Sequence, residues 1–220
     1  MDDLYRRVLD EHRTRRAAEP RSPEWSAVES DLEAHGIDTT DFGLFSSVAP
    51  THFDYEAAGP VLIEWLPRVD DPTLKETIAR SLIGATGSAR VAADALASDF
   101  RRVPDDGTRW AYANSLAVLA DASIADELLD LITDPELGSS REMLCSALKK
   151  TNDPRVPEVL IELIDDDDVS GHAISALRSY GPKRSLPYLE LARAKLEAVM
   201  RRPTASDFAK RQARRALERI

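Results

Sequence analysis

The residues with the clearest capacity for chemistry are four consecutive aspartates, Asp165 to Asp168, in a chain of 220 residues. Carboxylates at alternate positions are the ligands of a calcium loop, and the stretch from Asp166 to Gly171 matches the opening of such a loop. Its twelfth position, where a bidentate glutamate is required, is Leu177. We therefore expect an exposed turn between two helices, where carboxylates near a helix N-terminus are mildly favourable.

The histidines and the cysteine add no reactive constellation. Histidines 12, 35, 52 and 172 have no spacing that places two of them on adjacent turns of one helix. Cys145 is the single cysteine, and its apolar neighbour Leu144 favours a buried thiol over a nucleophile. The sequence contains no glycine-rich phosphate loop and no G-x-S-x-G string. We expect no catalytic residue, no metal ligand and no cofactor.

The composition indicates a globular and mostly helical protein. Hydrophobic residues make up 43% and charged residues 31%, whereas aromatic residues reach only 6% and there are nine glycines. This balance provides a core of its own and disfavours a β-sandwich or barrel with many tight turns. The net charge of −10 repels polyanions on average. One cysteine, a charged N-terminus and no long apolar run predict a cytoplasmic protein without a membrane segment.

A repeated string shows how the chain is organised. Val-Leu-Ile-Glu occurs at residues 61–64 and again at 159–162, with weaker copies between them. A second leucine series follows the first at a nearly constant interval, so each unit contains two helices. Paired helices with a period of about 30 to 34 residues are typical of an α-solenoid, in which stacking buries the apolar face of each unit. The first series is Leu62, Leu96, Leu128 and Leu160, in steps of 34, 32 and 32, and the second is Leu82, Leu116, Leu148 and Leu177.

The first unit contains the most regular motif. Leu74, Ile78 and Leu82 form one apolar stripe, and Asp71-Pro72 marks the start of that helix. The string from Asp70 to Leu82, DDPTLKETIARSL, resembles the HEAT repeat, especially the short HEAT-like form named after phycobilisome lyases. The resemblance covers residues 53–217 and implies an all-α fold, an α-solenoid of about five HEAT-like helical hairpins. Proteins of this class are scaffolds, adaptors, lyases or DNA glycosylases, so it indicates a fold rather than a chemistry.

The solenoid is expected to carry a helical cap at its N-terminal end. We predict a cap and connector over residues 1–52 and the repeats over 53–220, as one continuous domain. Helices are expected at 2–18 and 23–35, followed by a connector whose Ile37, Phe42, Leu44 and Phe45 pack on the first repeat. A fifth unit is expected to begin at 185–189, with a loop over 201–206 and a closing helix over 207–220.

The second helices of the units are enriched in basic residues, and the first helices are acidic. HEAT-like stacks line their concave surface with second helices, so this face is the expected binding surface. Lys75, Arg109 and Arg141 occupy the arginine column of the family, which implies a ladder bonded to aspartates such as Asp70, Asp105 or Asp106, and Asp134, or else a role in binding. Trp110 is either a core residue or an exposed interface anchor. The candidate binding residues are Arg80, Trp110, Asn114, Lys149 and Arg178.

Three functions follow from these observations. The first is a non-enzymatic scaffold that holds a peptide segment or a domain of another protein in the concave face, where an acidic or amphipathic helix is the complementary partner. The second is nucleic-acid binding through the basic inner helices, as in the HEAT-like DNA glycosylases, which the net charge opposes. A lyase-type subunit is the third, and it is implied only by the name of the repeat form.

Overall fold

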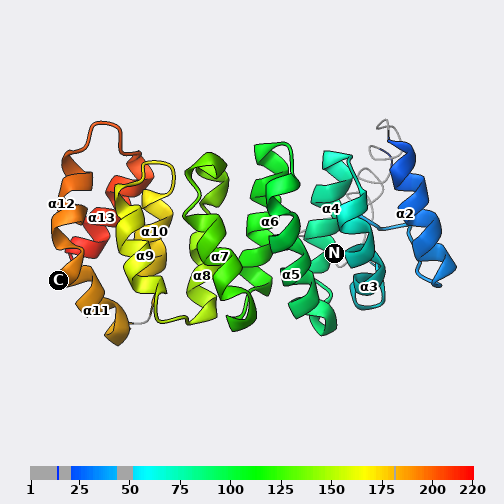
Figure 1. Ribbon diagram of the computed structural model, residues 1–220, viewed down its shortest axis with the longest axis horizontal. Helices are drawn as coiled ribbons and strands as arrows, with labels where there is room; N and C mark the ends of the chain where they lie inside the picture. Colours follow the sequence, from blue (N-terminus) through cyan, green and yellow to red (C-terminus); the bar gives the residue numbers. More distant parts are fainter. Residues whose placement is uncertain (1–13, 15–20, 44–51, 181) are drawn as a thin grey trace, which may run out of the picture. The chain divides into compact units, whose positions relative to one another are not determined.

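The computed structural model describes residues 14, 21–43, 52–180 and 182–220, and the regular elements in these residues are all helices (Figure 1). The all-α, solenoid-type fold class is therefore confirmed. The chain folds into two compact units, residues 1–95 and 96–220, and α5 (Ala89–Asp99) carries the chain from one to the other. The predicted division at residue 52 follows the repeat and stays a prediction.

Unit 1 begins with the cap helix that the sequence predicts. α2 ends where Gly36 adopts a φ of +77°, a conformation that glycine reaches without strain. Asp71 starts α4 by accepting hydrogen bonds from the backbone N–H groups of Thr73 and Leu74, with Pro72 in the first turn. The described helices of this unit are α2 (Pro23–Ala34), α3 (Tyr55–Trp65), η1 (Leu66–Arg68), α4 (Pro72–Leu82) and η2 (Thr86–Ser88).

Aromatic side chains join α2 to α3 and to the residues just before it. The ring of Phe42 lies 5.8 Å from that of Trp25 and 5.2 Å from that of Phe53, measured between centroids. Trp65 on α3 donates its indole N–H to Asp31 on α2 over 2.7 Å. Ile37 and Phe42 are buried, as expected of the connector, whereas the predicted contacts of Leu44 and Phe45 and nearly all of the predicted helix over 2–18 lie outside the described residues.

Unit 2 is a stack of antiparallel helix pairs. α7 packs on α8, α9 on α10 and α12 on α13, while α6, α8, α10 and α13 contact one another in that order and form a layer of second helices. Its elements are η3 (Phe100–Arg102), α6 (Asp106–Leu119), η4 (Ala122–Ile124), α7 (Ala125–Ile132), η5 (Pro135–Arg141), α8 (Leu144–Thr151), α9 (Val156–Glu162), η6 (Leu163–Asp165), α10 (Ser170–Arg178), α11 (Pro182–Leu191), α12 (Arg193–Arg201) and α13 (Asp207–Leu217).

The repeated leucines form the core of both units. Every member of the two series has no solvent-exposed surface. Each fully buried leucine contributes roughly 1.5–3 kcal/mol relative to an exposed one, so the periodicity marks the residues that hold each helix pair together. The buried set is Leu62 and Leu82 in unit 1, and Leu96, Leu116, Leu128, Leu148, Leu160 and Leu177 in unit 2.

The fifth helix pair differs from the prediction. The segment expected to form its first helix is α11, and the helix that packs on α13 is the next one, α12. α12 buries Leu196 and Val199 against a helix whose buried face consists largely of alanines, which allows a close approach. α13 also packs closely on α10, because a Cβ on Gly171 would lie 2.5 Å from the Phe208 ring. α11 is thus an inserted helix between two regular pairs.

Candidate functional site

Two residues of the predicted basic ladder are structural. Lys75 is 4% exposed, and its ammonium group donates to the carbonyl of Leu66 over 2.9 Å. Arg141 is 1% exposed, and its Nη1 donates to the carbonyl of Ile132 over 3.0 Å. Each side chain therefore satisfies an orphan carbonyl at the end of the helix before it, which is the group that a helix C-terminus leaves unpaired.

Arg141 also joins two repeats through the acidic run. Its Nε donates to the carbonyl of Gly138 over 2.9 Å, and its Nη2 lies 2.8 Å from Asp166 and 3.7 Å from Asp168. The expected ladder partner Asp134 instead pairs with Arg101 at 3.2 Å. A carboxylate of the following turn replaces it because the side chain points toward the next repeat. The buried charge is therefore paired, and each of its three nitrogens has a hydrogen-bond partner, as burial requires.

Arg109 forms the ion pair expected of the ladder. Its Nη1 lies 2.7 Å from Asp106, and its Nε donates to the carbonyl of Val103 over 2.9 Å. Asp105, the other expected partner, caps α6 by accepting from the backbone N–H of Thr108 over 2.8 Å. Backbone hydrogen bonds and the side chain of Thr108 lower the pKa of Asp105 despite partial burial, which raises it. Arg109 thus uses its guanidinium to bind groups at the start of its own helix, α6.

The other two aspartates of the acidic run bind a residue that the repeat did not predict. Arg202, from the turn between α12 and α13, lies 3.2 Å from Asp165 and 2.7 Å from Asp167, and it also donates to the carbonyl of Ile164 over 3.4 Å. Ile164 lies one repeat after Ile132, whose carbonyl accepts a hydrogen bond from Arg141. The residue one repeat after Arg141 in the arginine column of the ladder is Ser170, which is too short to reach this carbonyl. Arg202 therefore makes the equivalent contact in this unit. Among the described residues, no group of His, Cys, Asp or Glu side chains could hold a metal ion.

Trp110 lies on the surface of α6. Its side chain is 42% exposed, and Val118 on the same helix is 49% exposed. Asn114 lies between them, half-buried, and its side-chain amide donates to the carbonyl of Trp110 over 2.8 Å. The leucine register had left Trp110 as either a core residue or an exposed anchor. The structure therefore shows that Trp110 is exposed, and that Val118 is exposed two turns farther along the same helix.

Lys149 and Arg178 extend this surface over α8 and α10. Lys149 is half-buried and donates to the hydroxyl of Ser179 over 3.0 Å. Arg178 donates from Nη1 to Gln212 over 2.7 Å, while its buried Nε has no hydrogen-bond partner in the structure. We name the side chains that α6, α8 and α10 present here the second-helix ridge of unit 2: Trp110, Asn114, Val118, Lys149 and Arg178. The candidate Arg80 belongs to unit 1 and pairs with Glu76 at 2.7 Å.

Cys145 and His172, two titratable side chains on the second helices, are uncharged near neutral pH. Burial raises the pKa of the Cys145 thiol to about 12, and the thiol is fully buried. Desolvation lowers the pKa of His172 in spite of Glu142, whose carboxylate is 3.8 Å away and opposes the shift. The imidazole is therefore neutral near pH 7, and it packs against the ring of Phe208.

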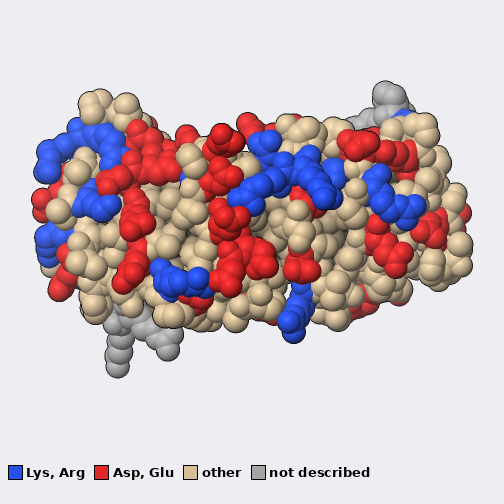
Figure 2. Space-filling model, viewed as in Figure 1, with Lys and Arg blue, Asp and Glu red and all other residues tan. Residues whose placement is uncertain are grey.

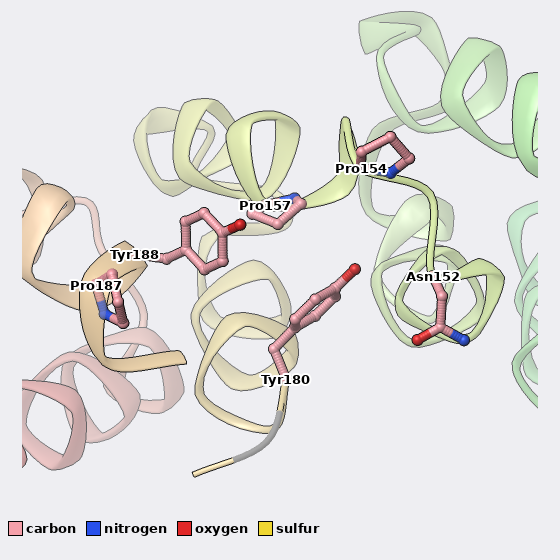
Figure 3. A pocket seen from close by; sticks show the side chains of 6 residues that line it. All are labelled: Asn152, Pro154, Pro157, Tyr180, Pro187 and Tyr188. Atoms are coloured by element: carbon pink, nitrogen blue, oxygen red, sulfur yellow. The ribbon is translucent and has the colours of Figure 1, made fainter. Parts of the chain in front are cut away.

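A cavity of about 480 Å³ opens near the C-terminal ends of α8 and α10 (Figure 3). The hydroxyl groups of Tyr180 and Tyr188 point into the space beside Pro157. Sequence analysis did not single these residues out, because they come from three separate segments and form no motif. The lining residues are Asn152, Pro154, Pro157, Tyr180, Pro187 and Tyr188, which offer hydrogen bonds and rings but no acid–base pair.

Figure 2 shows basic and acidic side chains in adjoining groups on its visible face, and ion pairs explain part of this pattern. Arg155 illustrates it, with Asp126 at 2.5 Å and Asp153 at 2.7 Å. The hydrogen bonds from Arg155 lower the pKa of Asp153 to about 2, so this pair stays ionised over the physiological range. Many surface cations of unit 2 are thus neutralised by aspartates of neighbouring turns.

The family comparison agrees with this architecture. A model of HEAT repeats matches residues 93–178, which extend from α5 to the last residue of α10. Residues 93–178 are HEAT repeats. HEAT repeats commonly mediate contacts between proteins. No curated protein and no solved structure matches the chain. Within the described residues, none of the helices combines the length and the apolar character that crossing a membrane requires.

Proposed function

We propose that this protein is a non-enzymatic scaffold that binds a segment of another protein along the second-helix ridge of unit 2. The observation that carries the proposal is the exposure of Trp110 on a HEAT-repeat helix, with Val118 exposed two turns farther along the same helix. Tryptophan is enriched among the residues that dominate binding energy at interfaces, and truncating such a residue typically costs about 2 kcal/mol or more. Isolated exposed aliphatic residues need no explanation, but an exposed tryptophan is the kind of residue that anchors interfaces.

The charges beside this apolar pair favour an acidic or amphipathic partner segment. Lys149 and Arg178 continue the ridge onto α8 and α10, so an apolar contact on α6 and basic contacts farther along are available to one bound segment. Electrostatic complementarity of this kind raises the rate of association and selects the partner more than it adds affinity. A single buried cysteine and no membrane-spanning helix among the described residues are compatible with work in the cytoplasm.

Nucleic-acid binding is the second candidate, since exposed arginines on α13 could contact phosphates. The net charge of −10 and the small number of aromatic residues oppose it. A lyase-type function has no supporting observation in the residues described above. Nuclease treatment separates the first two candidates in a single experiment.

The test is a pull-down from nuclease-treated native lysate with a matched control. The binding variant carries Trp110→Ala, Asn114→Ala and Lys149→Ala. The control carries Glu127→Ala and Glu158→Ala, two exposed residues of the first helices α7 and α9. We expect a protein that the wild type and the control retain and the binding variant loses. A partner that all three retain equally would place binding on another surface.

A further inference from the structure

α13 carries exposed cations that form no ion pair within the described part of the chain. Arg211, Arg214 and Arg215 are exposed, and no carboxylate of the described residues lies within ion-pair distance of them. Six other cations of unit 2 are paired with aspartates, whereas Arg102 and Arg201 are single exposed arginines without an ion pair among the described residues. These paired residues are Arg101, Arg109, Arg141, Arg155, Lys195 and Arg202. In a protein with a net charge of −10, a local excess of arginine is a departure from the surrounding surface.

Arg178 on α10 adds a fourth guanidinium to this group. It lies beside α13, because its Nη1 donates to Gln212 of that helix. Burial lowers the pKa of Arg178, and the positive charges of Arg219 and Arg215 lower it further, with only Glu218 opposing them. Like charges are therefore crowded here with only Glu218 to compensate them, and a bound anion would relieve the remaining repulsion. We name Arg178, Arg211, Arg214 and Arg215 the α13 arginine patch.

Helix capping explains only part of the patch. Cations in the last turn interact favourably with the helix dipole, and Arg214 and Arg215 occupy that turn. Arg219 likewise has a structural role, because it donates to the carbonyl of Arg178 over 2.8 Å and to Ser185 over 3.2 Å. Arg211 lies in the middle of α13, where the dipole has little effect. Neither helix capping nor an ion pair among the described residues gives Arg211 a structural role beside Arg214 and Arg215.

The spacing of the arginines defines what they could bind. Arg211 and Arg215 are four residues apart, so they lie on one face of the helix and are separated by about 6 Å along its axis. Guanidinium groups bind carboxylates with paired hydrogen bonds, and each pair is directional. Carboxylates recurring at the same pitch, every fourth residue of a helix, would match both arginines at once.

We propose that the α13 arginine patch binds an acidic helical segment of a partner protein whose glutamates recur at every fourth position. The inference rests on the proposed scaffold function and supplies the chemistry of its partner. The segment would itself be destabilised by like charges at i and i+4, and binding relieves that repulsion. The regular carboxylate spacing distinguishes such a partner from a nucleic acid, whose phosphates are recognised by charge without regard to this pitch.

The experiment uses two fluorescein-labelled, alanine-based 15-residue peptides of equal composition. One has glutamates at every fourth position, and the other has the same glutamates distributed around the helix. The protein variants are Arg211→Ala with Arg215→Ala, and a control with Arg102→Ala and Arg201→Ala, two exposed arginines without an ion pair among the described residues. Affinity is measured by fluorescence anisotropy at two salt concentrations, and circular dichroism checks that each variant is folded.

We expect the regularly spaced peptide to bind the wild type and the control equally, and the α13 variant about tenfold more weakly. The reversed pair, Arg211→Glu with Arg215→Glu, is expected to prefer a peptide with lysines in place of the glutamates. Equal affinity for both glutamate peptides, equal losses in both arginine variants, or stronger binding of a labelled DNA duplex would overturn the proposal. If the native partner requires Trp110 but not Arg211 and Arg215, the scaffold function stands and only this inference fails.

Discussion

Two arginine environments in unit 2 contrast sharply. At the start of α8, Arg141 is buried and uses Nε, Nη1 and Nη2 within the protein. On α13, Arg211 and Arg215 are exposed and have no ion pair among the described residues. The same side chain is therefore structural in one region and available to a partner in the other. What decides between the two is whether its donors are already occupied.

The contrast also separates two ways in which acidic residues are used. The aspartates of the run from Asp165 to Asp168 bind Arg141, Lys195 and Arg202, so the segment that first suggested a metal loop holds neighbouring repeats together. α13 has Asp207 in its first turn and Glu218 at its C-terminal end, but among the described residues neither forms an ion pair with its exposed arginines. The net charge of −10 is an average over the whole chain, and it does not reveal that the α13 arginine patch is basic.

The largest expected effect is on Arg141. Arg141→Ala leaves the carbonyl of Ile132 and the carboxylate of Asp166 without their partner, so we expect the free energy of unfolding to fall by about 3–5 kcal/mol. Urea unfolding followed by circular dichroism measures it. Arg211→Ala is the matched control and should change stability by no more than about 0.5 kcal/mol. Similar losses in both variants would remove the distinction between the two environments.

A smaller effect is expected at Arg202, which is paired but partly exposed. Arg202→Ala removes the contacts to Asp165, Asp167 and the carbonyl of Ile164. Solvent screens these charges, which reduces their contribution to the free energy of unfolding. We expect a loss of about 1 kcal/mol in the same unfolding experiment, since half-exposed charged hydrogen bonds contribute modestly. Arg201→Ala, at an exposed neighbour without an ion pair among the described residues, serves as the control. If Arg202→Ala had no more effect than Arg201→Ala, Arg202 would not be a substitute for the column arginine.

Much of the fold could be predicted from the sequence, because leucine periodicity and proline positions are local signals. Leu74, Ile78 and Leu82 lie on one apolar face, and Asp71 caps the helix as its position indicates. The inserted helix α11 could not be predicted, since the fifth pair is determined by how α12 packs on α13. The ion pairs of Arg141 and Arg202 join residues far apart in sequence, so no spacing rule identifies them.

The candidate site was only partly accessible to sequence reasoning. The register turned Trp110 away from the leucine stripe, but it left burial against a neighbouring helix open until the structure showed the exposed side chain. For Arg211 and Arg215 the sequence gives the charge of the closing helix but does not show which carboxylates lie nearby. The two tyrosines that line the cavity near α11 could not be recognised from the sequence, because three separate segments of the chain form the cavity lining.

Site-specific photocrosslinking tests the central claim most directly. Trp110 on the second-helix ridge, Arg211 in the α13 arginine patch and, as a control, the exposed Glu127 on α7 are each replaced by p-benzoylphenylalanine in the cell. The account predicts adducts with the same protein at positions 110 and 211 and none at 127. Adducts at 127 with none at 110 would contradict it, because the partner would then bind the face formed by the first helices.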